Sequence, residues 1–185
     1  MLMIGSAGAN AGKTELACAV LRKFSRLDQA IVGIKVTTIN EKDGQCPRGG
    51  EGCGACSSLD GVYLITEETD PDSGKDTSRL LAAGASRVYW LRILRKHIDE
   101  GFAALLDVLG PDAISICESN SLRHVVEPGL FLVAVRKDAR TWKPSAMEVR
   151  KFADRIIVSD GSSFDLDIDR IKLKNSRWLL SAHDK

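Results

Sequence analysis

The stretch GSAGANAGKTELA, Gly5 to Ala17, decides the fold expected for this chain of 185 residues. It follows the short apolar run MLMI and leads into KTELACAVLRKF, in which apolar residues recur at helical spacing. It matches the phosphate-binding loop G-x-x-x-x-G-K-[ST] except at the first position, where Ala7 stands in place of glycine. That position needs a compact residue, and a positive φ there would be costly for alanine.

Small residues matter in such a loop because they let consecutive backbone N–H groups curl around a phosphate at a helix N-terminus, where the helix dipole also favours negative charge. Lys13 would reach the β and γ phosphates, and the Thr14 hydroxyl would bind Mg²⁺. The alternative is a strand, turn and helix that contain Gly-Lys-Thr by chance. We predict a site for ATP or GTP formed by Gly8, Ala9, Asn10, Ala11, Gly12, Lys13, Thr14 and Glu15.

The composition limits the other classes of function. Lys and Arg number 26 against 25 for Asp and Glu, so no overall charge draws the protein to nucleic acid or to a membrane surface. No apolar run approaches the roughly 20 residues that span a bilayer, and the first residues do not resemble a signal peptide. We expect a single cytoplasmic domain over residues 1–185 that binds neither nucleic acid nor membrane.

The remaining chain alternates short apolar runs with segments of helical spacing, which indicates a mostly parallel sheet covered on both faces. The expected fold class is α/β, a P-loop NTPase three-layer sandwich with a mostly parallel central sheet. The expected strands are 2–4, 31–36, 62–65, 88–91, 113–117, 130–135 and 156–158, and the expected helices are 13–25, 77–83, 98–109 and 144–153. No element is assigned after Gly161.

Three further segments carry groups that a bound triphosphate needs. Glu118 follows an apolar strand in AISICESNS, where it is either a ligand of Mg²⁺ or a solvated turn residue. Asp76 opens a helix in SGKDTSRLLAAGA, where it is either a second ligand or a helix cap. Lys35 ends the second strand, where it either contacts a phosphate or carboxylate of a substrate or is an exposed strand end. Lys13, Lys35 and Glu118 are the candidate catalytic residues.

These segments, in this order, resemble the adaptor proteins of molybdopterin-guanine dinucleotide biosynthesis. The resemblance covers residues 1–136 in outline and is carried by GSAGANAGKTEL, VGIKVTT, GKDTSRLLAAGA, ISICESNSL and LFLVAVR. More broadly the chain is similar to the class that contains dethiobiotin synthetase and the nickel-inserting GTPases. The resemblance implies that Thr14, Asp76 and Glu118 surround Mg²⁺ and that Lys35 faces the transferred phosphate or the second substrate.

The chain departs from that family in two ways. Histidines are usual soon after the lysine of the second strand, whereas this chain has Val36-Thr37-Thr38. The guanine-reading sequence N-K-x-D is also missing, since Lys137 and Asp138 stand next to each other in VAVRKDAR. The base, adenine or guanine, therefore stays open.

A glycine-rich segment at about 40–60, NEKDGQCPRGGEGCGACSSLD, interrupts the alternation of strands and helices and carries three cysteines. Cys46, Cys53 and Cys56 have the spacing C-x6-C-x2-C, which suits zinc or an iron–sulfur cluster completed by another ligand, including one from the second chain of a homodimer. The alternatives are a redox-active dithiol and cysteines without a common role. A long loop inside a compact domain is uncommon unless it has a function.

Two functions follow from these residues. The first is slow hydrolysis of GTP or ATP by a protein that serves cofactor or metal-centre biosynthesis together with an assembly enzyme. The second is ATP-dependent transfer to a small-molecule acceptor, as in a kinase or a ligase of the dethiobiotin synthetase type. A non-catalytic adaptor that uses the nucleotide for its conformation is a third possibility.

The cysteine segment generates a prediction about metal content. Protein purified without oxygen should contain zinc or iron by elemental analysis, and Cys53→Ser should lower the metal content because it removes one of the two thiolates in CGAC. Cys18→Ser, in the expected first helix, is the matched control and should keep the metal. Metal-free wild-type protein with an unchanged fold would contradict the assignment.

Overall fold

The computed structural model describes residues 1–40, 59 and 61–182. Within these residues the chain forms an α/β fold around a mixed sheet of seven strands in the order β3-β4-β2-β5-β1-β6-β7. Among the described strands of this sheet, only the β3–β4 pair is antiparallel. The strands are β1 (Leu2–Ser6), β2 (Val32–Ile39), β3 (Tyr63–Glu67), β4 (Arg87–Leu94), β5 (Ser115–Glu118), β6 (Leu130–Arg136) and β7 (Arg155–Ser159).

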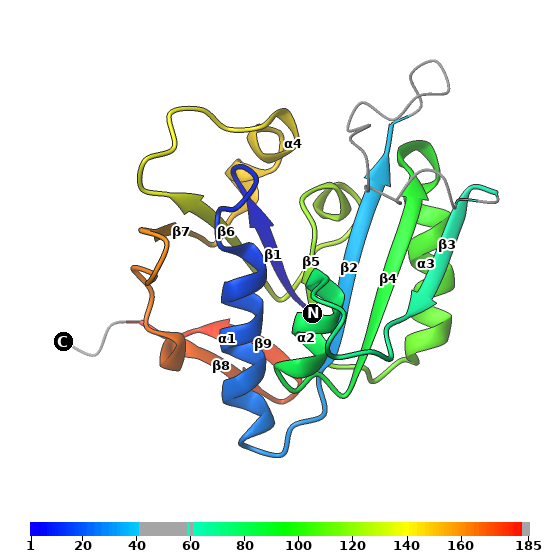
Figure 1. The fold of residues 1–185 in the computed structure, drawn as a ribbon, viewed down its shortest axis with the longest axis horizontal. Helices are drawn as coiled ribbons and strands as arrows, with labels where there is room; N and C mark the ends of the chain where they lie inside the picture. The colour runs from blue at the N-terminus through cyan, green and yellow to red at the C-terminus, as the bar shows by residue number, and fades with distance from the viewer. Residues whose placement is uncertain (41–58, 60, 183–185) are drawn as a thin grey trace.

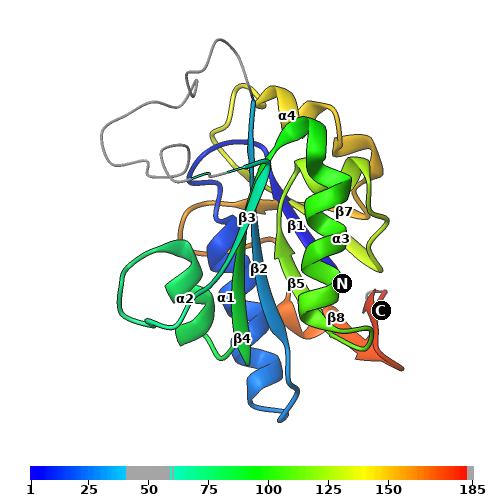
Figure 2. The same cartoon turned by 90° about the vertical axis from the view of Figure 1, so that its right-hand side faces the viewer.

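Helices cover both faces of the sheet, as the two views in Figures 1 and 2 show. On one face lie α1 (Lys13–Ser25) and α2 (Asp76–Ala82), and on the other lies α3 (Ile98–Leu109). Alternate residues of β1 serve the two layers, since Ile4 packs with the α1 side and Met3 with the α3 side. Central strands buried on both faces read as continuous apolar runs, which is why the parallel sheet could be expected from the sequence.

The last expected helix, 144–153, is shorter than the sequence indicates. The structure has one turn of helix, α4 (Pro144–Met147), followed by a 3₁₀ turn at Arg150–Phe152. The break lies at Val149, whose φ of −108° departs from helical values and whose side chain is fully buried against the α3 side of the sheet. Burial of that side chain therefore sets the path of the chain here.

The C-terminal part forms a hairpin that the sequence analysis did not assign. Strands β8 (Ile171–Lys174) and β9 (Arg177–Leu180) are joined by Asn175 and Ser176, which have φ of 49° and 60°. Two positive φ values in a two-residue loop are the mark of a type I′ turn. Trp178 on β9 is fully buried and meets the ring of Phe24 edge to face at 4.9 Å, which fixes the hairpin to α1.

No helix among the residues of the described ranges is long and apolar enough to cross a membrane.

The Trp178 contact generates a stability prediction. Trp178→Ala should lower the free energy of unfolding by about 3–5 kcal/mol, because it leaves a cavity between the hairpin and α1. Leu179→Ala is the matched control. The side chain of Leu179, next to Trp178 in the sequence, is 44% exposed, so its removal should lower the free energy of unfolding by only about 0.5 kcal/mol. Denaturant unfolding followed by circular dichroism measures both values. If Trp178→Ala lowered the free energy of unfolding no more than Leu179→Ala does, the contact between the hairpin and α1 would not stabilise the domain.

Candidate functional site

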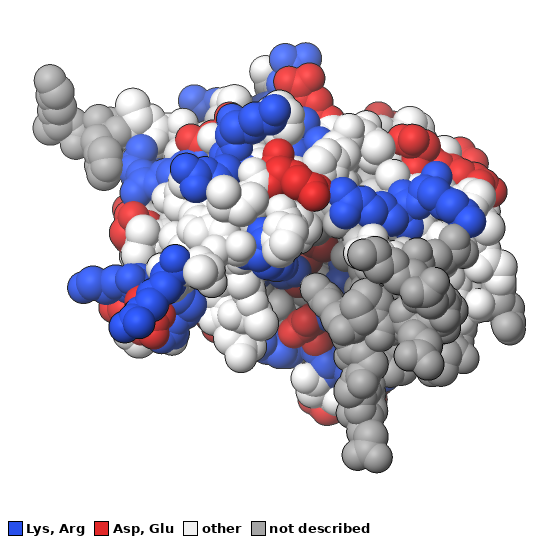
Figure 3. Space-filling view, turned by 90° about the horizontal axis from the view of Figure 1, so that it is seen from above, with Lys and Arg blue, Asp and Glu red and all other residues white. Residues whose placement is uncertain are grey.

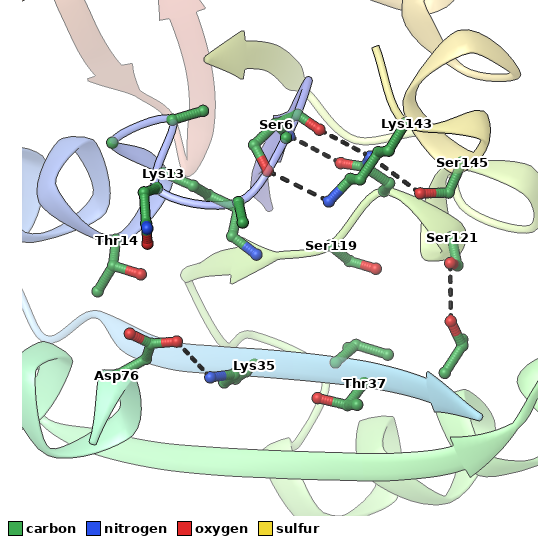
Figure 4. A pocket seen from close by; sticks show the side chains of 18 of the residues that line it. Ser6, Lys13, Thr14, Lys35, Thr37, Asp76, Ser119, Ser121, Lys143 and Ser145 are labelled. Carbon is green, nitrogen blue, oxygen red and sulfur yellow. Dashed lines mark hydrogen bonds and ion pairs between the residues drawn. The ribbon is translucent and has the colours of Figure 1, made fainter. Parts of the chain in front are cut away.

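A pocket of about 920 Å³ lies at the edge where β1, β2 and β5 end (Figure 4). Parallel strands place their carboxyl ends on one edge of the sheet, where ligands bind in open α/β folds. Residues 8–15 line one side of this pocket, and residues 35–40 and 119–121 line others. All predicted nucleotide-binding residues therefore border one space. Lys35 and Asp76 border it as well.

The glycine-rich loop ends in a left-handed residue that starts α1. Gly12 has φ of 85°, and a Cβ atom there would come within 3.0 Å of the Phe164 ring, so both conformation and space require glycine. No side chain of the described residues caps the N-terminus of α1. The first N–H groups of a helix lack partners within it and carry the positive end of the helix dipole. This end of α1 can therefore accept an anion.

The departure at position 7 does not disturb the loop. Ala7 is buried and is not among the residues of the described part with positive φ. Its N–H donates to the Ala134 carbonyl at 2.8 Å, and its own carbonyl accepts from the Lys143 N–H at 2.8 Å. The backbone at this position is thus an ordinary extension of β1, where a compact residue suffices and glycine is not needed.

Lys13 and Glu118 meet at the base of the pocket. Glu118 is fully buried at the end of β5, beside Ile4 of β1 and Lys35 of β2 in the sheet register. Neither carboxylate oxygen receives a hydrogen bond from the residues that the structure describes, and the Lys13 Nζ lies 3.5 Å from Oε2. A buried carboxylate needs a compensating charge, and the loop lysine supplies it. Glu118 thus lies beneath the pocket rather than among its lining residues.

Lys35 and Asp76 form a second ion pair at the pocket wall. The Lys35 ammonium donates a hydrogen bond to Oδ2 of Asp76 (Figure 4). Burial alone would raise the pKa of Asp76, but the hydrogen bond from Lys35 and the nearby charges of Lys13 and Arg79 outweigh it, and the pKa is lowered. No side chain in the described part of the chain caps α2, so Asp76 acts there as a charge partner and not as a cap.

The helices α1 and α2 are joined beside the pocket. Arg79 of α2 pairs with Glu15 of α1, and the Cys18 thiol donates to the Arg79 carbonyl at 3.4 Å. Cys18 is buried, as expected for a core residue, and burial raises its pKa to about 11. A Cβ on Gly84 would come within 2.6 Å of Ser25, so this glycine allows the chain after α2 to approach α1 closely.

The sequence analysis missed a polar network at the start of the loop. The Asn120 amide spans the last residue of β1, because its Oδ1 accepts from the Ser6 N–H at 2.8 Å and its Nδ2 donates to the Ser6 carbonyl at 3.0 Å. Its Nδ2 also lies 3.4 Å from the Ser145 hydroxyl, and the Lys143 ammonium lies 3.4 Å from the Ser6 hydroxyl. Asn120 stands in the ESNS turn, so its position after Glu118 was the available signal.

The remaining predicted residues are three cysteines and the pair Lys137 and Asp138. Cys46, Cys53 and Cys56 fall outside the described residues. Lys137 and Asp138 do not line the pocket, and Asp138 accepts a hydrogen bond from Arg136 in its own turn. In the described ranges no group of three or more His, Cys, Asp and Glu side chains is placed to hold a metal ion.

Comparisons with protein-family models, with curated proteins and with solved structures gave no match.

The Lys35–Asp76 pair generates a prediction about pH. Because the pKa of Asp76 is below its ordinary value of 3.8, its ionised form stabilises the fold above that value, and the stabilisation is lost as the pH falls through the lowered pKa. Asp76→Asn should therefore be less stable than wild type at pH 7, and the difference should shrink as the pH is lowered to about 3. Denaturant unfolding at several pH values measures this difference.

The exposed Asp72, in the turn before α2, provides the control, and Asp72→Asn should change stability little at any of these pH values. A constant difference between wild type and Asp76→Asn across the range would contradict the ion pair.

Proposed function

We propose that the chain is a P-loop NTPase that binds ATP or GTP with Mg²⁺ in this pocket and cleaves the bond to the γ-phosphate. The observation that carries the proposal is the uncapped start of α1, which follows the left-handed Gly12 and opens on the pocket beside Lys13. Backbone N–H groups, the helix dipole and an ammonium group together form the arrangement that binds phosphate in proteins of this class.

The residues present fit Mg²⁺. Magnesium binds through one or two carboxylates, a hydroxyl, waters and phosphate oxygens. Thr14 lines the pocket, and Glu118 has two buried oxygens that accept no hydrogen bond within the described ranges, which a cation or its bound water would satisfy. Asp76 would be the second carboxylate ligand once it gives up its ion pair with Lys35. When bound, Mg²⁺ would withdraw negative charge from the phosphate oxygens.

The chain's own residues would act by position and charge. The N–H groups of the loop and of the first turn of α1 would hold the phosphates, and Lys13 would stabilise the charge that develops on them. On binding, the Lys13 ammonium would exchange its contact with Glu118 for contacts with phosphate oxygens. Lys35, released from Asp76, would face the transferred phosphoryl group or the group that receives it.

Two forms of this function remain as proposals. Slow hydrolysis in the service of cofactor or metal-centre biosynthesis follows from the sequence resemblance, and metal binding by the cysteine segment follows from the spacing of its cysteines. Transfer to a small-molecule acceptor is favoured by one observation, since the pocket continues past the loop to hydroxyl groups at the ends of β2 and β5. Release of phosphate in the absence of any acceptor would favour hydrolysis.

Lys13 provides the direct test of nucleotide binding. Lys13→Met should weaken binding of ATP and GTP by about tenfold or more, because a hydrogen bond from a charged group to phosphate is lost. Calorimetric titration with each nucleotide and Mg²⁺ measures the affinity and identifies the base preference. Lys172→Met, at an exposed position of β8, is the control and should bind as wild type does.

Removal of Lys13 alone leaves a buried carboxylate without its cation, which threatens the fold. The double variant Lys13→Met with Glu118→Gln removes both charges and keeps the side-chain volumes similar. A folded double variant with wild-type nucleotide affinity would refute the proposed function.

A further inference from the structure

We infer that the pocket contains a second anion-binding subsite, next to the start of the glycine-rich loop, and that Lys143 is its cation. The subsite would take a small acceptor that carries a phosphate or a carboxylate. The inference rests on the proposed function and names the class of its second substrate. It is carried by the division of the pocket, by the fixed position of Lys143 and by the charges and hydroxyl groups that line the space.

The pocket has two ends. At one end the turn after β7 packs on the end of the glycine-rich loop, where Phe164 faces Gly12. Gly161 and Ser162 of this turn line the pocket wall. At the other end the wall consists of Ser119 and Ser121 after β5 and of residues 37–40 at the end of β2. Figure 4 shows Lys13 and Thr14 on one side of the space and Ser119, Ser121 and Thr37 on the other. A nucleotide held by the loop and α1 would leave this second end to another molecule.

Lys143 reaches the pocket from the segment between β6 and α4. Its backbone N–H donates to the Ala7 carbonyl, which ties the residue to the start of the loop. Its side chain extends from this anchor to the Ser6 hydroxyl, and Figure 4 shows the ammonium directed into the pocket. Asn120 holds Ser6 and contacts Ser145, so the same network fixes the strand end and the segment that carries Lys143. The ammonium is thus preorganised relative to the phosphate-binding loop.

The charges around the pocket favour an anion. Among its described lining residues, five side chains are cationic and two are carboxylates. Both lining carboxylates are already paired, Asp76 with Lys35 and Glu15 with Arg79. Two carboxylates outside the lining also pair with lining cations, Glu118 with Lys13 and Glu148 with Arg95, so five cations meet four carboxylates. Figure 3 looks onto this edge of the molecule and shows Lys and Arg side chains at several places on it, with Asp and Glu between them. A cleft lined by an excess of one charge concentrates ligands of the opposite charge.

The hydroxyl groups of the second end suit oxygen atoms of a ligand. The Thr38 and Ser121 hydroxyls lie 2.9 Å apart and either can donate to the other. A hydroxyl can therefore turn its proton toward an incoming oxyanion, as the side chains at phosphate and carboxylate sites do. An anionic acceptor oxygen would form the new bond to the γ-phosphorus while the bond to the bridging oxygen breaks and nucleoside diphosphate leaves, with no proton to remove.

The test is a calorimetric titration of protein saturated with Mg²⁺ and a non-hydrolysable triphosphate analogue. Inorganic phosphate and acetate are titrated separately at equal ionic strength, and the tighter of the two identifies the acceptor group. At least one should bind to the saturated wild type, and Lys143→Met should weaken that binding by about tenfold or more while nucleotide affinity changes little. Lys137→Met, in the same segment but outside the pocket lining, should behave as wild type.

Three outcomes would overturn the inference: neither anion binds to the saturated protein, the anion displaces the nucleotide analogue, or Lys143→Met binds the anion as tightly as wild type. Failure of the analogue itself to bind would refute the proposed function instead. The titration is then repeated without nucleotide, where phosphate binding that Lys143→Met abolishes supports the subsite and binding that survives the substitution contradicts it.

Discussion

The ion pair between Lys13 and Glu118 is the interaction on which the arrangement of the site depends. Glu118 is fully buried at the end of a central strand, where an isolated carboxylate would be very costly. The Lys13 ammonium lies 3.5 Å away and enters from the first residue of α1, so the pair joins the helix to the centre of the sheet. Helix α1 therefore begins at one fixed point, and the glycine-rich loop must close the distance from β1 to that point.

The order of the strands turns this pair into a site. β5 lies between β1 and β2, so Glu118 stands beside the strand that leads into the loop and beside the strand that carries Lys35. Asp76 at the start of α2 then pairs with Lys35. Segments far apart in the sequence meet here because parallel strands end on one edge of the sheet. The position of each charge follows from the topology and the register, and short-range sequence preference plays little part.

This distinction explains how much the sequence could reveal. The buried strands and the bounds of α1 and α3 follow from apolar periodicity, which is a local property. The sequence indicates Lys13 by the motif of the phosphate-binding loop and Asp76 by its place at the start of a helix. It indicates Lys35 and Glu118 by their places at the ends of apolar strands. That Lys13 would pair with Glu118 and Lys35 with Asp76 depends on register, which a single sequence does not specify. Asn120 and Lys143 are ordinary turn residues until the fold places them beside Ser6.

The two ion pairs also bear on how a ligand would enter. Lys13 already faces Glu118 and Lys35 already faces Asp76, so these two ammonium groups are paired within the protein and held near the pocket. A phosphate would then compete with a carboxylate for each lysine, and the carboxylates set free would become available to a divalent cation. Binding of the phosphate and of the divalent cation would therefore be coupled. The phosphate would pair with the lysines, and the cation would pair with the carboxylates that the lysines leave. The same exchange would discriminate against a phosphate that arrives without Mg²⁺, because that phosphate would leave Glu118 and Asp76 without cations.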